Sequence, residues 1–118
     1  MSKITELTTL DDLDDMLAAS ATAAVVLLKH SAACPVSAIA RGHFDRLSED
    51  DEVQPFLVIV QRARDVSNAV ADKLAVRHET PQAIVIRDRK AVYVANHYQV
   101  SANDLKERVM PSNGSDTS

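Results

Sequence analysis

The spacing of hydrophobic positions changes several times along the chain, and each change predicts a different element. The stretch Ala23–Lys29 is a continuous apolar run with β-branched members, which is typical of a strand covered on both faces. Pro55–Gln61 has the same character and predicts a second buried strand. Two further apolar runs flank Asp88-Arg89-Lys90 and predict a hairpin whose turn carries no glycine.

Four helices are predicted around these strands. The first begins after Thr9, a good N-cap residue, and the second begins at Pro35, because proline suits the first helical position. The third covers Asp65–Val76, and the fourth follows Ser101. The face of the second helix that is predicted to pack inward consists of Val36, Ile39, Ala40, His43, Phe44 and Leu47.

The order of these elements predicts the fold. Two strands joined by a helix imply parallel pairing, and the hairpin adds antiparallel strands. We therefore predict an α/β fold of the thioredoxin-like kind, with a four-stranded mixed central sheet flanked by helices on both faces. This domain is expected to span residues 1–110, and the polar segment 111–118 is expected to be a disordered tail.

Composition and charge narrow the class of protein. The 118 residues are 46% hydrophobic and 25% charged, as in a soluble globular domain. The net charge is −4 and the basic residues are scattered, so we expect no nucleic-acid partner. No stretch approaches the ~20 apolar residues of a membrane span, and the start lacks the apolar segment of a secretion signal. With a single cysteine, which can form no internal disulfide, these features predict a cytoplasmic location.

That cysteine, Cys34, lies where a predicted buried strand gives way to a helix. The first N–H groups of a helix have no backbone partners, and the macrodipole adds about half a positive charge there. Both features favour a thiolate, so Cys34 is predicted to be a nucleophile with a lowered pKa. The alternative is an inert buried cysteine.

Ser37 lies one helical turn after Cys34, where dithiol redox proteins carry a second cysteine. A serine cannot attack a mixed disulfide, so the chemistry left is monothiol exchange completed by an external thiol. The Ser37 hydroxyl either donates a hydrogen bond to the thiolate or is an ordinary exposed serine of the first turn.

Other polar residues are weaker candidates. His30 either pairs with Cys34 or lines the loop before it. Arg64 follows the second strand, at the edge where parallel strands bind ligands, and either meets the carboxylates of a small thiol or is simply solvated. The scattered histidines lack the spacing of a zinc site, so no metal is predicted.

The segments KHSAACPVS, RDVSNAVADKLAVRHETPQ and AVYVANHYQVS resemble the bacillithiol-system monothiol bacilliredoxins of the YtxJ type, a thioredoxin-like family. The similarity covers roughly residues 5–108. It implies a thiol-disulfide oxidoreductase that removes bacillithiol, or another low-molecular-weight thiol, from S-thiolated cytoplasmic proteins. The small thiol is then a co-substrate, and no cofactor is tightly bound.

The resemblance also implies residue roles. Cys34 matches the nucleophile of the family. The rest of the active-site motif is formed by Pro35, Ser37, His30 and Ser31. Thr80 and Pro81 match a substrate-gripping loop with a cis-proline that faces the cysteine. The hairpin departs from the family, where DGK usually stands in place of Asp88-Arg89-Lys90.

Two other functions are carried as alternatives, and the oligomeric state is left open. One is an iron–sulfur carrier like the monothiol glutaredoxins, which Pro35 disfavours because it replaces the glycine that follows their cysteine. The other is a non-enzymatic thioredoxin-like interaction module with an inert Cys34.

Overall fold

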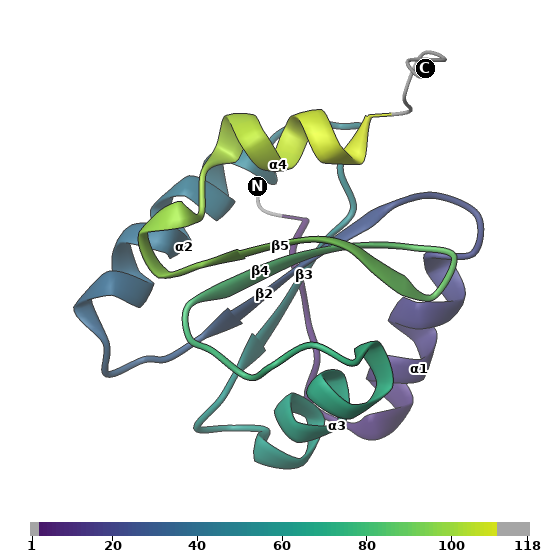
Figure 1. Ribbon diagram of the computed structural model, residues 1–118, viewed down its shortest axis with the longest axis horizontal. Coiled ribbons are helices and arrows are strands. Elements are labelled where there is room, and N and C mark those ends of the chain that lie inside the picture. The colour runs from purple at the N-terminus through teal and green to yellow at the C-terminus, as the bar shows by residue number, and fades with distance from the viewer. Residues whose placement is uncertain (1–2, 111–118) are drawn as a thin grey trace.

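A five-stranded mixed sheet forms the centre of the computed structural model, which describes residues 3–110 (Figure 1). The strand order is β1-β3-β2-β4-β5. β1 and β2 run parallel to β3, and β4 runs antiparallel to both β2 and β5. The strands are β1 Thr5–Glu6, β2 Val25–His30, β3 Pro55–Ile59, β4 Gln82–Arg87 and β5 Lys90–Asn96. The predicted tail, residues 111–118, lies outside the described residues.

The prediction of a four-stranded sheet is wrong by one strand. The additional strand, β1, pairs with β3. Thr5 lies opposite Phe56 and Glu6 opposite Leu57. The N–H of Leu7 then donates to the carbonyl of Leu57 at 2.7 Å, and the Leu7 side chain is buried. Two residues are too short to show a strand alternation, so the segment carries no strand signal of its own. It becomes a strand because the edge of β3 offers it backbone partners.

Helices cover both faces of the sheet, as predicted. In Figure 1, α2 and α4 lie over one face and α1 and α3 over the other. Alternate residues of β2 face the two layers, so that Val26 and Leu28 pack with α2 and α4 while Val25 and Leu27 pack with α1 and α3. The helices are α1 Leu10–Ala19, α2 Pro35–Leu47, α3 Arg64–Leu74 and α4 Ala102–Val109, with a short 3₁₀ helix, η1, at His97–Gln99. None of the helices within residues 3–110 is long and apolar enough to cross a membrane.

The starts of α1 and α4 follow the predicted N-caps, Thr9 and Ser101. The Thr9 hydroxyl accepts the N–H of Asp12, and the Asp12 carboxylate accepts the N–H of Thr9, each at 3.1 Å. This reciprocal capping box satisfies two N–H groups that the first turn leaves unpaired. Ser101 caps α4 by accepting the N–H of Asp104 at 3.4 Å. The N-cap of α2 is Cys34, which makes no side-chain cap hydrogen bond.

The inward face of α2 differs from the prediction. Its buried residues are Ser37, Ala40, Phe44 and Leu47. Ile39 is 54% exposed and His43 is only half-buried, so the inward placement of Ile39 is wrong. The helix is rotated so that Ser37 takes the first inward position, where its hydroxyl has a backbone partner. Apolar character alone does not reveal this rotation, because both sets of residues have helical spacing.

The hairpin turn between β4 and β5 contains no glycine. It lies beside Ser20, the residue that follows α1. Asp88 and Arg89 have φ values of 55° and 66°, the left-handed region that a two-residue hairpin turn requires. Side chains strain this conformation, and glycine does not. Hydrogen bonds compensate, because the N–H of Asp88 donates to the Ser20 carbonyl at 2.7 Å and the N–H of Arg89 to the Ser20 hydroxyl at 2.9 Å.

Candidate functional site

Cys34 lies at the boundary between the loop after β2 and the start of α2. Its backbone is extended, with φ −108° and ψ 121°, as an N-cap residue requires. Pro35 follows at the first helical position. The cysteine is free and half-buried, so its sulfur stands at the helix end and is still accessible.

The start of α2 lowers the pKa of Cys34 below its ordinary value. The main cause is the backbone N–H of Ser37 near the sulfur, and the N–H of Val36 and the Ser37 hydroxyl act in the same direction. Partial desolvation opposes them but does not outweigh them. These donors favour the thiolate, the form of cysteine that acts as a nucleophile.

Ser37 is fully buried, so the interpretation of Ser37 as an exposed first-turn serine is wrong. Its oxygen accepts the N–H of Ser31 at 3.3 Å. A hydroxyl has one proton, and this arrangement leaves that proton free to point at the Cys34 sulfur. Ser37 therefore connects the loop before the cysteine to the cysteine itself.

Ser37→Ala is expected to raise the pKa of Cys34 and to slow its alkylation by iodoacetamide at neutral pH. The variant removes one of the donors that stabilise the thiolate. Each unit of increase in the pKa lowers the thiolate fraction about tenfold at a pH below the pKa. The alkylation rate measured against pH gives the shift directly.

The matched control is Ser48→Ala, which removes a buried hydroxyl at the other end of α2. The Ser48 hydroxyl donates to the Asp45 carbonyl at 2.7 Å. This variant is expected to leave the thiol titration unchanged. A pKa that does not move in Ser37→Ala would show that the backbone N–H groups alone stabilise the thiolate.

Gln61 holds the loop before Cys34 and was missed by sequence reasoning. Its side-chain oxygen accepts the N–H of Ala32 at 3.1 Å, and its side-chain nitrogen donates to the Ser31 hydroxyl at 2.8 Å. The sequence places Gln61 only at the end of a predicted strand. Its contacts depend on β3 lying beside β2, which no local pattern reveals.

His30 ends β2 beneath this loop. Burial lowers the pKa of its imidazole, the positive charge of Arg41 acts in the same direction, and a contact with the Ser37 backbone opposes both. His30 Nδ1 is buried and has no hydrogen-bond partner within residues 3–110. The ring lies beside the Ser37 backbone and is not among the groups that shift the pKa of Cys34. This geometry favours a loop-lining histidine over a base that acts on the sulfur.

The loop before β4 lies at the same edge of the sheet. Its Thr80–Pro81 peptide bond is cis, as the family resemblance implied. Lys29 of β2 is paired with Gln82 of β4, so Pro81 lies beside the end of β2. The Pro81 carbonyl accepts the N–H of His97 at 2.8 Å, which links this loop to η1.

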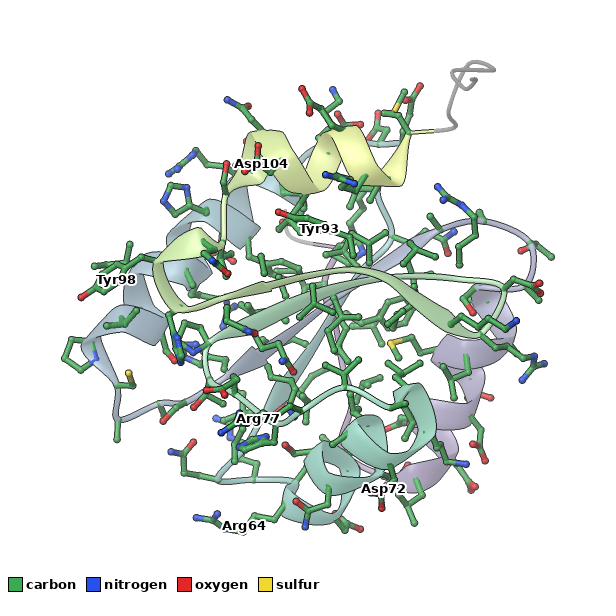
Figure 2. All side chains as sticks on the ribbon, viewed as in Figure 1. Arg64, Asp72, Arg77, Tyr93, Tyr98 and Asp104 are labelled. Atoms are coloured by element: carbon green, nitrogen blue, oxygen red, sulfur yellow. The ribbon has the colours of Figure 1, made fainter. Side chains whose placement is uncertain are left out.

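Arg64 is exposed at the start of α3, and Figure 2 shows its side chain pointing away from the molecule. Arg62, two residues earlier, forms an ion pair with Glu6 at 3.1 Å. Residues 3–110 contain no group of three or more His, Cys, Asp and Glu side chains that could hold a metal ion.

The sheet order, the single cysteine at the start of α2 and the cis-proline loop define a monothiol protein of the thioredoxin-like class. The family model described as monothiol bacilliredoxin BrxC matches residues 5–105. The chain therefore belongs to the monothiol bacilliredoxin family.

Solved structures agree with this class. The chain is 28% identical to a candidate oxidoreductase with a thioredoxin fold, with a TM-score of 0.81 over 89% of this chain and 92% of the other. Two thioredoxins share the fold at lower identity. That of Malassezia sympodialis is 11% identical, with a TM-score of 0.73 over 92% of this chain and 90% of the other. That of Fasciola hepatica is 21% identical, with a TM-score of 0.70 over 89% and 95%.

Proposed function

We propose that the protein is a cytoplasmic thiol-disulfide oxidoreductase that removes bacillithiol, or another low-molecular-weight thiol, from S-thiolated proteins. The observation that supports this most is the pairing of Cys34 with Ser37. The N–H groups at the start of α2 lower the pKa of Cys34, and the position one turn later holds a buried hydroxyl in place of a second thiol. Family membership points in the same direction.

The proposed reaction has two exchange steps. The Cys34 thiolate attacks the sulfur of the small thiol in the protein mixed disulfide. A disulfide forms between Cys34 and the small thiol, the original disulfide breaks, and the substrate protein leaves as a thiolate. A second molecule of the small thiol, as its thiolate, then attacks the sulfur of the small thiol on Cys34. This step forms the disulfide of the small thiol and returns Cys34 as a thiolate, so the external thiol supplies the electron pair.

Residues around the sulfur have proposed roles in both steps. The N–H groups of Val36 and Ser37 stabilise the Cys34 thiolate when it attacks and again when it leaves. Pro35, His30 and Ser31 shape the loop and the helix start that present the sulfur. The backbone at Thr80 and Pro81 is proposed to bind the substrate chain, and Arg64 to meet carboxylates of the small thiol. The oligomeric state has no part in this proposal.

The test is transfer of the adduct to Cys34. The wild-type protein is incubated with an S-bacillithiolated protein, and its intact mass is followed by mass spectrometry. We expect a species heavier by one bacillithiol, which disappears when free bacillithiol is added. A parallel reaction with a glutathione-modified substrate identifies the preferred thiol. The proposal is overturned if no adduct reaches the chain from either substrate.

The two alternatives have their own tests. An inert interaction module requires a Cys34 thiol that titrates at or above the ordinary cysteine pKa of about 8.5, and alkylation rates against pH measure this. An iron–sulfur carrier requires a visible cluster spectrum after anaerobic reconstitution. The lowered pKa of Cys34 argues against the first alternative.

A further inference from the structure

Lys29 is a charged residue buried in the centre of the sheet. It lies in β2 and is 0% exposed. Its Nζ is 2.7 Å from Nδ1 of His78 and 3.5 Å from the carbonyl of Ser67 on α3. Burying an ammonium group is costly unless hydrogen bonds compensate, so the short contact with His78 has a large share in keeping Lys29 in place.

The contact reaches the middle of the segment Arg77–Pro81, which we call the cis-proline loop. The ends of this loop are also tied to the sheet. The Gln82 side-chain nitrogen donates to the Arg77 carbonyl at 2.8 Å, and the N–H of His97 donates to the Pro81 carbonyl at 2.8 Å. Figure 2 shows Arg77 where the chain passes from α3 toward β4. Between these two ends, the loop is held by Lys29, whose side chain lies in the interior of the protein.

His78 is itself an exposed residue whose Nδ1 is turned inward to Lys29. An ammonium group only donates, so Nδ1 must be unprotonated to accept from it. Burial and the nearby Lys29 charge lower the pKa of His78 and keep its ring neutral at pH 7. Burial lowers the pKa of Lys29 to about 8, and Glu79 opposes this shift. At pH 7 the contact is therefore a charged donor facing a neutral acceptor.

We infer that Lys29 is a positioning residue that acts through His78, holding the cis-proline loop where the substrate protein binds. Lys29 thereby sets the affinity for the substrate protein without touching the Cys34 sulfur. The inference rests on the proposed function, in which the backbone of this loop binds the substrate chain.

Few charged groups lie near Lys29. The carboxylate of Glu79 acts on it from the same loop and is itself near two cations, at 3.5 Å from Arg77 and 3.2 Å from His97. The neighbours across the sheet are Gln82 and Val58, which carry no charge. From α3, the contact is the Ser67 carbonyl. As the pH rises through about 8, Lys29 loses its charge and its hydrogen bond to His78 weakens.

The test uses three variants. His78→Leu removes the acceptor, whereas His78→Asn places an amide oxygen near the position of Nδ1 and retains it. Lys29→Met removes the charge and keeps an apolar chain of similar shape. Because His78 lies at the surface, its variants are expected to fold even if Lys29→Met does not.

The readouts are steady-state kinetics with an S-bacillithiolated protein and the alkylation rate of Cys34. In His78→Leu and Lys29→Met we expect KM to rise roughly ten- to a hundredfold, which corresponds to the loss of one hydrogen bond to a charged group. We expect kcat and the alkylation rate to stay at wild-type values, and His78→Asn to restore KM. Wild-type KM should rise above pH about 8, and KM of Lys29→Met should not change there.

A second readout needs no substrate. Hydrogen exchange of the backbone amides at residues 77–80 is expected to accelerate in His78→Leu and Lys29→Met but not in His78→Asn. Unchanged exchange in all three variants overturns the inference. If the wild type transfers the adduct, a wild-type KM in both His78→Leu and Lys29→Met also overturns it. A wild-type protein that transfers no adduct overturns the proposed function, while the exchange experiment still tests whether Lys29 holds the loop.

Discussion

Replacing Cys34 by serine is expected to abolish transfer of the small thiol and to leave the protein at least as stable as the wild type. Serine lacks the sulfur nucleophile, so no mixed disulfide can form. The same residue is a preferred N-cap, and the backbone of Cys34 already has the extended N-cap conformation without a side-chain cap hydrogen bond. A serine hydroxyl there can accept the N–H of Ser37. The reactive sulfur thus occupies a position where a hydroxyl would serve the fold better.

Cys34→Ala is the matched control for this prediction. It is equally unable to form the mixed disulfide but cannot cap the helix. Exchanging serine for alanine at an N-cap costs about 0.5–2 kcal/mol, so the alanine variant should melt below the serine variant. Intact mass after incubation with an S-thiolated protein measures transfer, and thermal unfolding measures stability. Transfer by Cys34→Ser would contradict the assignment of the nucleophile, and equal melting temperatures would contradict the capping argument.

Phe44→Ala is expected to reduce the free energy of unfolding by about 3–5 kcal/mol. Phe44 is 0% exposed and joins α2 to the core that this helix shares with α4 and the sheet. Small domains are stable by only about 5–15 kcal/mol, so this one substitution removes a large part of the total. Because α2 carries Cys34 at its start, the loss also loosens the element that presents the sulfur.

Urea unfolding of Phe44→Ala and Ile39→Ala, compared with the wild type, measures this effect. Ile39 lies on the same helix but is 54% exposed, so its truncation should change stability by less than about 0.5 kcal/mol. The midpoint should fall in Phe44→Ala with little change in the denaturant slope. A comparable loss in Ile39→Ala would mean that Ile39 packs into the core, and it would contradict the exposed position of this side chain.

The features that the sequence predicts are those encoded by neighbouring residues. A strand followed by a proline-initiated helix places Cys34 at a helix start, and Thr9 and Ser101 mark two more helix starts through local capping chemistry. The features that it misses depend on distant partners. β1 exists only because it pairs with β3, and Gln61 holds the Cys34 loop only because β3 lies beside β2.

Lys29 shows the same limit within one residue. Lysine is almost never fully buried without a partner, and the residues around Lys29 in the sequence offer none. The structure buries it because His78, 49 residues further along the chain, covers its ammonium group. No pattern around Lys29 contains that information. Lys29 becomes buried only because the cis-proline loop, which carries His78, lies beside β2.

Because Ser37 stands in place of a second cysteine, the modification state of Cys34 is expected to report on the thiol balance of the cell. In the proposed reaction no thiol within the chain can remove the adduct from Cys34, because Cys34 is its only cysteine. The adduct stays until a free small thiol arrives. The fraction of molecules that carry it is therefore set by the balance between modified proteins and free thiol in the cell. Mass spectrometry of the protein recovered from cells under oxidative stress would measure this fraction, and thus this balance, directly.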